Sequence, residues 1–220
     1  MSEGAAPNIG VTMIAIHHAI TRGLAIGIER GTGFVRQGYP DAATQAGFVM
    51  YVQTLATVVS AHHISEDEVA FPYLRDKLPD VPFDKLMADH RVMEGMLEEL
   101  KTAAGGSDAA QSLGGMTKTL SELADLWHPH IGIEERDIYD VEIIAGLMDV
   151  DENVRVGQML AEKAQQYVVP PYLGIPWLLY NLPPDQRASF ARTMPPAVIQ
   201  ELVPVAWKEH WAPMGPFLLD

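Results

Sequence analysis

The chain has 220 residues, which is enough for one domain with a sizeable core. Its hydrophobic content of 48% and charged content of 20% indicate a globular protein rather than a disordered one. A net charge of −14 argues against nucleic acid and anionic membrane surfaces as partners. The absence of cysteine excludes disulfides, zinc ribbons, cysteine-ligated iron–sulfur clusters and thiol nucleophiles. Any metal site must therefore be built from histidine and carboxylate side chains.

The sequence carries no recognisable targeting signal. The N-terminal residues "MSEGAAPN" lack a basic region and an apolar region, so we expect no signal peptide. Apolar stretches such as "AGFVMYVQTLATVVSA" contain Gln, Thr and Ser, and we expect them to be too short to span a bilayer. The expected location is the cytoplasm, with no membrane partner, and the oligomeric state stays open.

Helical periodicity dominates the first 150 residues, and no strand-like alternation interrupts it. The first helix is expected from Val11 to about Arg30, ended by "GTGFVRQGYP", and the second from about Ala42 to Leu78, with Asp41 as N-cap and Pro72 bending it or marking its last turns. The third and fourth are expected over 83–104 and 109–148, the fourth weakened at Gly114-Gly115 and at Pro129. Short connections between four long helices predict an all-α, up-down-up-down four-helix bundle.

The C-terminal part has a different composition. A fifth helix is expected from about Asp151 to Tyr167, and after "VVPP" the chain becomes rich in proline and aromatic residues. This composition predicts short helices broken by prolines, which pack on the bundle as a cap or form an interface. The predicted organisation is a bundle domain over residues 1–150 and a helical extension over 151–220.

Histidines occur on all four predicted bundle helices. The segment "AHHISEDEVAFP" places His62 four residues before Glu66, and "LWHPHIGIEERDIY" places His130 four residues before Glu134, so each pair shares one helix face. The simplest interpretation of a lone histidine is a core or surface residue, and the pairs are compatible with a solvated face. Histidines on four helices, two of them with a paired glutamate, favour a metal site instead.

The donor types restrict which metal fits. Imidazole and carboxylate without thiolate suit iron, manganese or zinc. A structural zinc ion needs about four ligands, and more are available here. The set therefore suits a dinuclear site.

Four segments together resemble the hemerythrin-like family, the His-His-Glu cation-binding domains: "IHHAITRGL", "HHISEDEVAFP", "DHRVMEGMLEEL" and "HPHIGIEERDIY". They cover roughly residues 8 to 148, and their combined spacing is specific, whereas each alone would be weak. The ferritin-like carboxylate proteins need Glu-x-x-His on two helices. No such motif occurs here, and Asp125 to His128 is only a loose approximation.

The resemblance implies a set of metal ligands and a cofactor of two iron ions bridged by an oxo or hydroxo group and by carboxylates. At three positions a neighbouring residue is an alternative. His18 could replace His17, and Glu135 could replace Glu134. His128 could replace His130, since Pro129 disturbs a regular helix. Asp67, Glu68 and Glu135 are expected outside the ligand set, and His210 outside the bundle. The implied ligands are His17, His62, His63, Glu66, His90, His130 and Glu134.

A count of ligands leaves about one open position, expected on the iron held by His17 and His62, where O2, hydrogen peroxide, NO or azide would bind. We expect no catalytic residue beyond the ligands. A histidine-rich set disfavours strongly oxidising states, which favours decomposition of hydrogen peroxide or nitric oxide. The alternatives are reversible O2 binding or storage, and an oxygen- or iron-sensing interaction module with a partner surface on the C-terminal extension.

Overall fold

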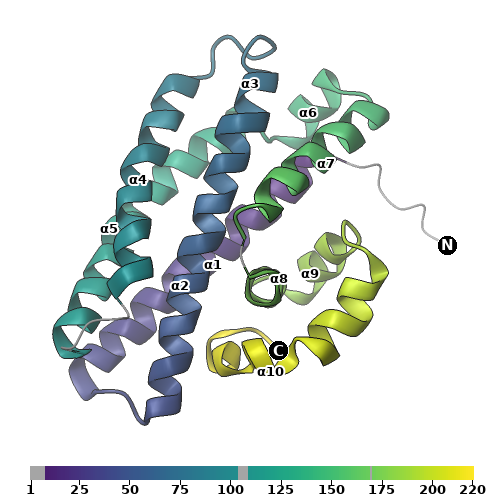
Figure 1. The fold of residues 1–220 in the computed structure, drawn as a ribbon. Helices are drawn as coiled ribbons and strands as arrows, with labels where there is room; N and C mark the ends of the chain where they lie inside the picture. Colours follow the sequence, from purple (N-terminus) through teal and green to yellow (C-terminus); the bar gives the residue numbers. More distant parts are fainter. Residues whose placement is uncertain (1–7, 104–108, 169) are drawn as a thin grey trace.

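The computed structural model describes residues 8–103, 109–168 and 170–220, and the secondary structure of these residues is helical without any strand (Figure 1). Four long helices form a bundle: α1 (Ile9–Gln37), α2 (Ala42–Ser65), α4 (Phe83–Ala103) and α5 (Ala109–Asp137). Contacts run from α1 to α2, α2 to α4, α4 to α5 and α5 back to α1. Each helix therefore packs against its neighbours in sequence, which confirms the predicted all-α, hemerythrin-like bundle.

The first helix is longer than predicted, because it continues through Gly31 and Gly33. A Cβ atom at Gly31 would lie 2.6 Å from the Thr117 hydroxyl oxygen, so this glycine lets α1 approach α5 closely. The helix ends at Gly38, whose φ of +77° is the left-handed conformation that favours glycine. The predicted end near residue 30 was wrong.

The second helix begins as predicted and ends differently. Asp41 is its N-cap and accepts a hydrogen bond from the Thr44 amide at 2.7 Å. After Ser65 the chain forms one π-helical segment, η1 (Glu66–Ala70), and a short helix, α3 (Phe71–Leu74). The amide of Phe71 donates to the carbonyl of Glu66, five residues earlier. The helical stretch ends at Leu74 and not at Leu78. The π-helical turn begins at Glu66, a predicted ligand, and such turns are frequent at functional sites.

The fourth predicted helix is two helices. α5 continues through Gly114, Gly115 and Pro129 and ends at Asp137. A new helix, α6 (Val141–Leu147), starts because the Asp140 carboxylate caps it, accepting from the amides of residues 142 and 143 at 2.9 and 3.2 Å. The third helix agrees with its prediction up to residue 103, and its expected last residue, 104, lies outside the described residues.

The C-terminal extension consists of short helices, as predicted. α7 (Val150–Gln165) contacts α1, α2 and η1, and α8 (Pro171–Tyr180) contacts α1 and α2. The later elements lie together with α8 beside the bundle (Figure 1). They are α9 (Pro184–Ala191), η2 (Val198–Ala206), α10 (Lys208–Trp211) and η3 (Ala212–Phe217).

A buried polar network joins the extension to the bundle. The Asn181 side-chain oxygen accepts hydrogen bonds from Arg22 on α1 and from the Tyr51 hydroxyl on α2, the latter at 2.8 Å. Arg22 also donates to the carbonyl of Phe217 at 3.1 Å. A Cβ atom at Gly47 would lie 2.1 Å from the carbonyl oxygen of residue 213, so η3 approaches the α2 backbone directly. The extension is therefore packed on the bundle, while a domain boundary at residue 150 stays a prediction.

Two apolar helical stretches are longer than expected from the sequence. The helix Ile9–Gln37 and the continuous helical stretch Ala42–Leu74 are long and apolar enough to cross a membrane by length and composition alone. Half of each apolar window is buried inside the structure, and the core helix of a soluble protein passes the same test. The expectation that such stretches are too short to span a bilayer is corrected accordingly.

Candidate metal centre

The predicted donors form a polar layer between two apolar clusters. On α1, His17 lies between Met13 of the smaller cluster and Ala19 of the larger one. On α4, His90 likewise lies between Leu86 of the smaller cluster and Met93 of the larger one. The buried residues that precede the donors on α2 and α5 belong to the larger cluster, and those of the smaller cluster begin just after these helices, at Val69 and Ile138. The larger cluster fills most of the bundle, and the smaller one fills the end that α6 and α7 cover. The four helices thus bring their polar side chains to one level inside an apolar protein.

All seven predicted ligands meet in this layer, and none is more than 3% exposed. They form two adjoining groups, and the donor atoms within each group lie within 4.8 Å of one another. One group is purely imidazole and the other combines two imidazoles with two carboxylates. The first comprises His63, His90 and His130, and the second His17, His62, Glu66 and Glu134.

The two carboxylates lie between the groups. Oε2 of Glu66 is 3.2 Å from Nε2 of His62 in its own group and 3.6 Å from Nε2 of His90 in the other. Oε1 of Glu134 is 3.0 Å from Nε2 of His130, and its Oε2 is 3.5 Å from Nε2 of His17. Each glutamate therefore reaches donors of both groups, which is the arrangement that bridging carboxylates require.

Protein contacts alone leave this layer unsatisfied. Within the part of the chain that the structure describes, both carboxylates and several ring nitrogens are buried without a hydrogen-bond partner of good geometry. Nε2 of His90 and Nε2 of His130 face each other at 2.9 Å. A buried polar atom without a partner costs about 1–3 kcal/mol, and a cation would satisfy these lone pairs together. The atoms are Nε2 of His17, both ring nitrogens of His62 and His63, and both carboxylate oxygens of Glu66 and Glu134.

The protonation behaviour of the layer also fits a cation. Burial lowers the pKa of both His62 and His63 well below the ordinary value, so these imidazoles are neutral and offer lone pairs. Burial, together with the charge of Glu134, raises the pKa of Glu66 well above its usual range. Burial also pushes the pKa of Glu134 upward, but His130 and His90 outweigh it and hold that pKa below the ordinary value. Without a metal, the negative charge of one carboxylate disfavours ionisation of the other. A bound cation would allow both carboxylates to be ionised.

Three further carboxylates orient the imidazoles. Nδ1 of His90 lies 2.8 Å from Asp67, Nδ1 of His17 lies 3.1 Å from Glu135, and Nδ1 of His130 lies 3.5 Å from Asp89. A protonated Nδ1 that donates to a carboxylate leaves Nε2 free for a metal and makes the imidazole a stronger ligand. The three carboxylate contacts favour this tautomer, in which Nε2 of each histidine is available to a metal.

The contact between Asp67 and His90 can be tested by comparing substitutions at Asp67 and at the adjacent Glu68. Replacing Asp67 by alanine removes the partner of His90 Nδ1 but no donor, so we expect metal affinity to fall by roughly 10–100-fold while the fold is retained. Glu68→Ala is the matched control, because Glu68 is exposed and pairs with Lys163 at 2.8 Å. Competition titration with a chelator measures both affinities. Equal affinities for the two variants would contradict the orienting role.

The residues that could replace predicted ligands lie in different environments from those ligands. His18 and His128 are exposed, and so is His210 in the extension. Glu135 points to the outer side of His17, whereas Glu134 is fully buried in the layer. The geometry therefore brings His17, His130 and Glu134 together and leaves their neighbours His18, His128 and Glu135 outside the layer.

Sequence reasoning missed three residues around the layer. Asp89 was not considered, although it directly precedes His90. Trp127 is fully buried, its ring centroid lies 5.6 Å from that of His17 and 6.0 Å from that of His63, and its Nε1 donates to Thr21 at 2.9 Å. Tyr139 is the last residue of the segment "LWHPHIGIEERDIY" and follows the end of α5, but sequence reasoning assigned it no role. These contacts join residues of different helices, so no spacing along the chain predicts them.

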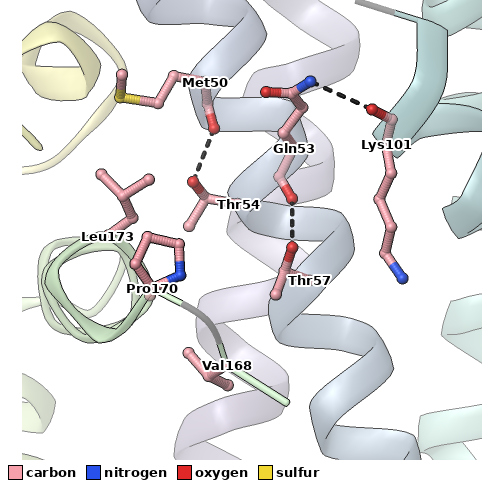
Figure 2. A pocket seen from close by; sticks show the side chains of 9 residues that line it. Met50, Gln53, Thr54, Thr57, Lys101, Val168, Pro170 and Leu173 are labelled. Atoms are coloured by element: carbon pink, nitrogen blue, oxygen red, sulfur yellow. Dashed lines mark hydrogen bonds between the residues drawn. The ribbon is translucent and has the colours of Figure 1, made fainter.

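A separate cavity of about 260 Å³ lies between α2 and the start of α8 (Figure 2). It contains none of the seven donors. The hydroxyls of Thr54 and Thr57 donate to backbone carbonyls of their own helix at 2.7 and 3.0 Å. The Lys101 ammonium is paired with Glu98 at 2.7 Å and Ser60 at 2.9 Å. Because these polar groups already have partners, the buried layer is the stronger candidate site.

The fold and the layer define a helical bundle built to bind metal through histidine and glutamate. The family model described as "Hemerythrin HHE cation binding domain" matches residues 12–141. This match covers more than half of the chain, and the protein belongs to the hemerythrin HHE cation-binding family. The chain therefore carries a metal-binding module. Comparisons with curated proteins and with solved structures found no match.

Proposed function

We propose that this protein holds two iron ions in the buried layer and uses them to decompose hydrogen peroxide. The ligands in this proposal are His17, His62, His63, Glu66, His90, His130 and Glu134. The observation that carries it is the position of Glu66 and Glu134, each of which lies between two separate groups of donors. A single ion would leave one of the groups unused.

The donor set favours iron over zinc. Five imidazoles and two carboxylates exceed what a four-coordinate structural zinc ion uses, and they suit six-coordinate iron. If each ion takes one oxygen from each carboxylate, the imidazole group supplies five protein donors and the mixed group supplies four. The exchangeable position then falls on the side of His17 and His62.

The iron pair, when bound, supplies reversible two-electron chemistry and a coordination position for a small oxidant. The protein contributes a dry enclosure: Trp127 and Phe71 pack against the imidazoles, the latter ring stacked on His90 at 5.5 Å. Asp67, Asp89 and Glu135 are only partly buried and contact the outer nitrogens of three ligands. They connect the buried layer to solvent and can pass protons, which peroxide decomposition needs.

The net reaction requires no organic substrate. One peroxide molecule loses two electrons and two protons and leaves as O2, and a second accepts two electrons and two protons and leaves as two water molecules. Apart from the donors and the Tyr139 hydroxyl, the described side chains around the layer are mostly apolar, so they offer no binding constellation for a larger substrate. Two small molecules of the same kind are therefore sufficient.

We expect the iron-loaded protein to release one O2 for every two peroxide molecules consumed, over many turnovers. An oxygen electrode measures the release, and Glu134→Ala and an equal amount of free iron are the controls. Bleaching of the protein by peroxide without O2 release would contradict the proposal.

Reversible O2 binding is the second candidate, and the burial of all seven donors favours it. A site shielded from water slows the oxidation that destroys an oxygen carrier. The reduced protein would then bind O2 with a visible absorption band that disappears under vacuum. That result without O2 release from peroxide would replace the first proposal by the second.

A further inference from the structure

Tyr139 has a buried hydroxyl next to the metal layer that the ligand set does not use. Its side chain is fully buried, and its hydroxyl has no hydrogen-bond partner of good geometry among the described residues. An unsatisfied buried hydroxyl costs about 1–3 kcal/mol. A phenylalanine would fill the same space without that cost, so packing alone does not account for the tyrosine.

The ring of Tyr139 lies on the mixed-donor side of the layer. It meets the ring of His17 edge-to-face at a centroid distance of 5.9 Å. Its hydroxyl lies beside the Glu66 carboxylate, which belongs to the same group as His17. The tyrosine therefore adjoins His17 and Glu66, which both belong to the mixed group.

The backbone holds this position firmly. The Tyr139 amide donates to the carbonyl of Glu134 at 2.7 Å, so the last turn of α5 connects the tyrosine directly to a proposed ligand. On the other side, α1 approaches so closely that a Cβ atom at Gly10 would lie 2.3 Å from the Tyr139 carbonyl oxygen. The ring is thus placed by two proposed ligand helices, and its hydroxyl has a defined direction.

This is the side on which the count of donors leaves the exchangeable position. The mixed group supplies four protein donors against five for the imidazole group, as argued above. A small molecule bound there would lie near His17, His62 and Glu66, and Tyr139 adjoins the first and the last of these. Such a molecule would offer the hydroxyl an acceptor.

We propose that Tyr139 donates a hydrogen bond to the small molecule bound on the His17 side of the metal pair. This inference rests on the proposed function, because it needs a metal with an exchangeable position. The hydroxyl is a donor to anything that carries negative charge, so it favours anionic ligands such as azide or hydroperoxide over neutral NO. Tyr139 would therefore select among small ligands without binding the metal.

Tyr139→Phe tests the inference, since it removes the hydroxyl and keeps the ring. We expect the variant to hold as much iron as the unmodified protein and to bind azide about tenfold more weakly, because a hydrogen bond to a charged group contributes roughly that factor. Its affinity for NO in the reduced protein should change much less. Azide titration followed by visible absorption, NO titration and iron analysis measure these three quantities.

Tyr39→Phe is the matched control, because Tyr39 packs on Phe34 away from the layer. An azide affinity equal in Tyr139→Phe and the unmodified protein would overturn the inference. A visible phenolate-to-iron band that the variant lacks would also overturn it, since Tyr139 would then be a ligand. Loss of iron from the variant would overturn it in the same way. If the unmodified protein itself binds neither iron nor azide, the proposed function fails first and the inference fails with it.

Discussion

Replacing Glu134 by alanine is expected to strip most of the iron from the protein. Glu134 reaches both groups of donors, and its two oxygens lie 3.0 and 3.5 Å from Nε2 of His130 and of His17. Loss of an orienting residue outside the ligand set already weakens metal binding by about 10–100-fold, so loss of a bridging ligand should exceed that range. Elemental analysis after removal of free metal measures the remaining iron.

Glu122→Ala is the control for this variant. Glu122 is on the same helix, is exposed, and pairs only with Lys118 at 3.2 Å among the described residues, so its removal should leave the iron content unchanged. Glu66→Ala should behave like Glu134→Ala, because Glu66 also lies between the groups. A Glu134→Ala protein that keeps the full iron content would show that Glu134 is no bridge.

Removing iron with a chelator under reducing conditions is expected to lower the melting temperature by about 10 °C. A ligand present at a thousand times its Kd stabilises the folded state by about 4 kcal/mol, and each kcal/mol shifts Tm by about 2–4 °C in a protein of this size. The physical reason is that the emptied layer keeps buried imidazoles and carboxylates without partners. Calorimetry before and after chelation measures the shift.

The Glu134→Ala variant provides the internal control for chelation. Because it should already lack iron, the chelator should leave its Tm unchanged. An unchanged Tm in the unmodified protein, after metal analysis has shown that the iron is gone, would mean that the layer is stable without a cation. Restoring iron should restore the original Tm.

The fold was predictable from the sequence because local signals define most of the bundle. Asp41 caps a helix where its spacing to an apolar run predicts it, and the positions of the long helices follow from their periodicity. The errors occur at helix ends. Gly31 resembles a breaker but serves close packing, and Asp140 is a cap whose effect is visible only once α6 turns away from α5.

The sequence was sufficient to predict which histidines and glutamates lie in the candidate site. Spacing places His62 with Glu66 and His130 with Glu134 on shared helix faces, and the resemblance aligns the remaining histidines. The surroundings were not predictable in the same way. Asp89 orients His130 from another helix, and Tyr139 reaches Glu66 across the bundle, so both depend on how helices pack and not on a local pattern.

Metal analysis of the purified protein, combined with its absorption spectrum, shows whether the buried layer holds two iron ions. We expect about two irons per chain and ligand-to-iron charge-transfer absorption in the near ultraviolet, because two groups of buried donors share Glu66 and Glu134. One zinc ion per chain without such absorption would contradict this expectation.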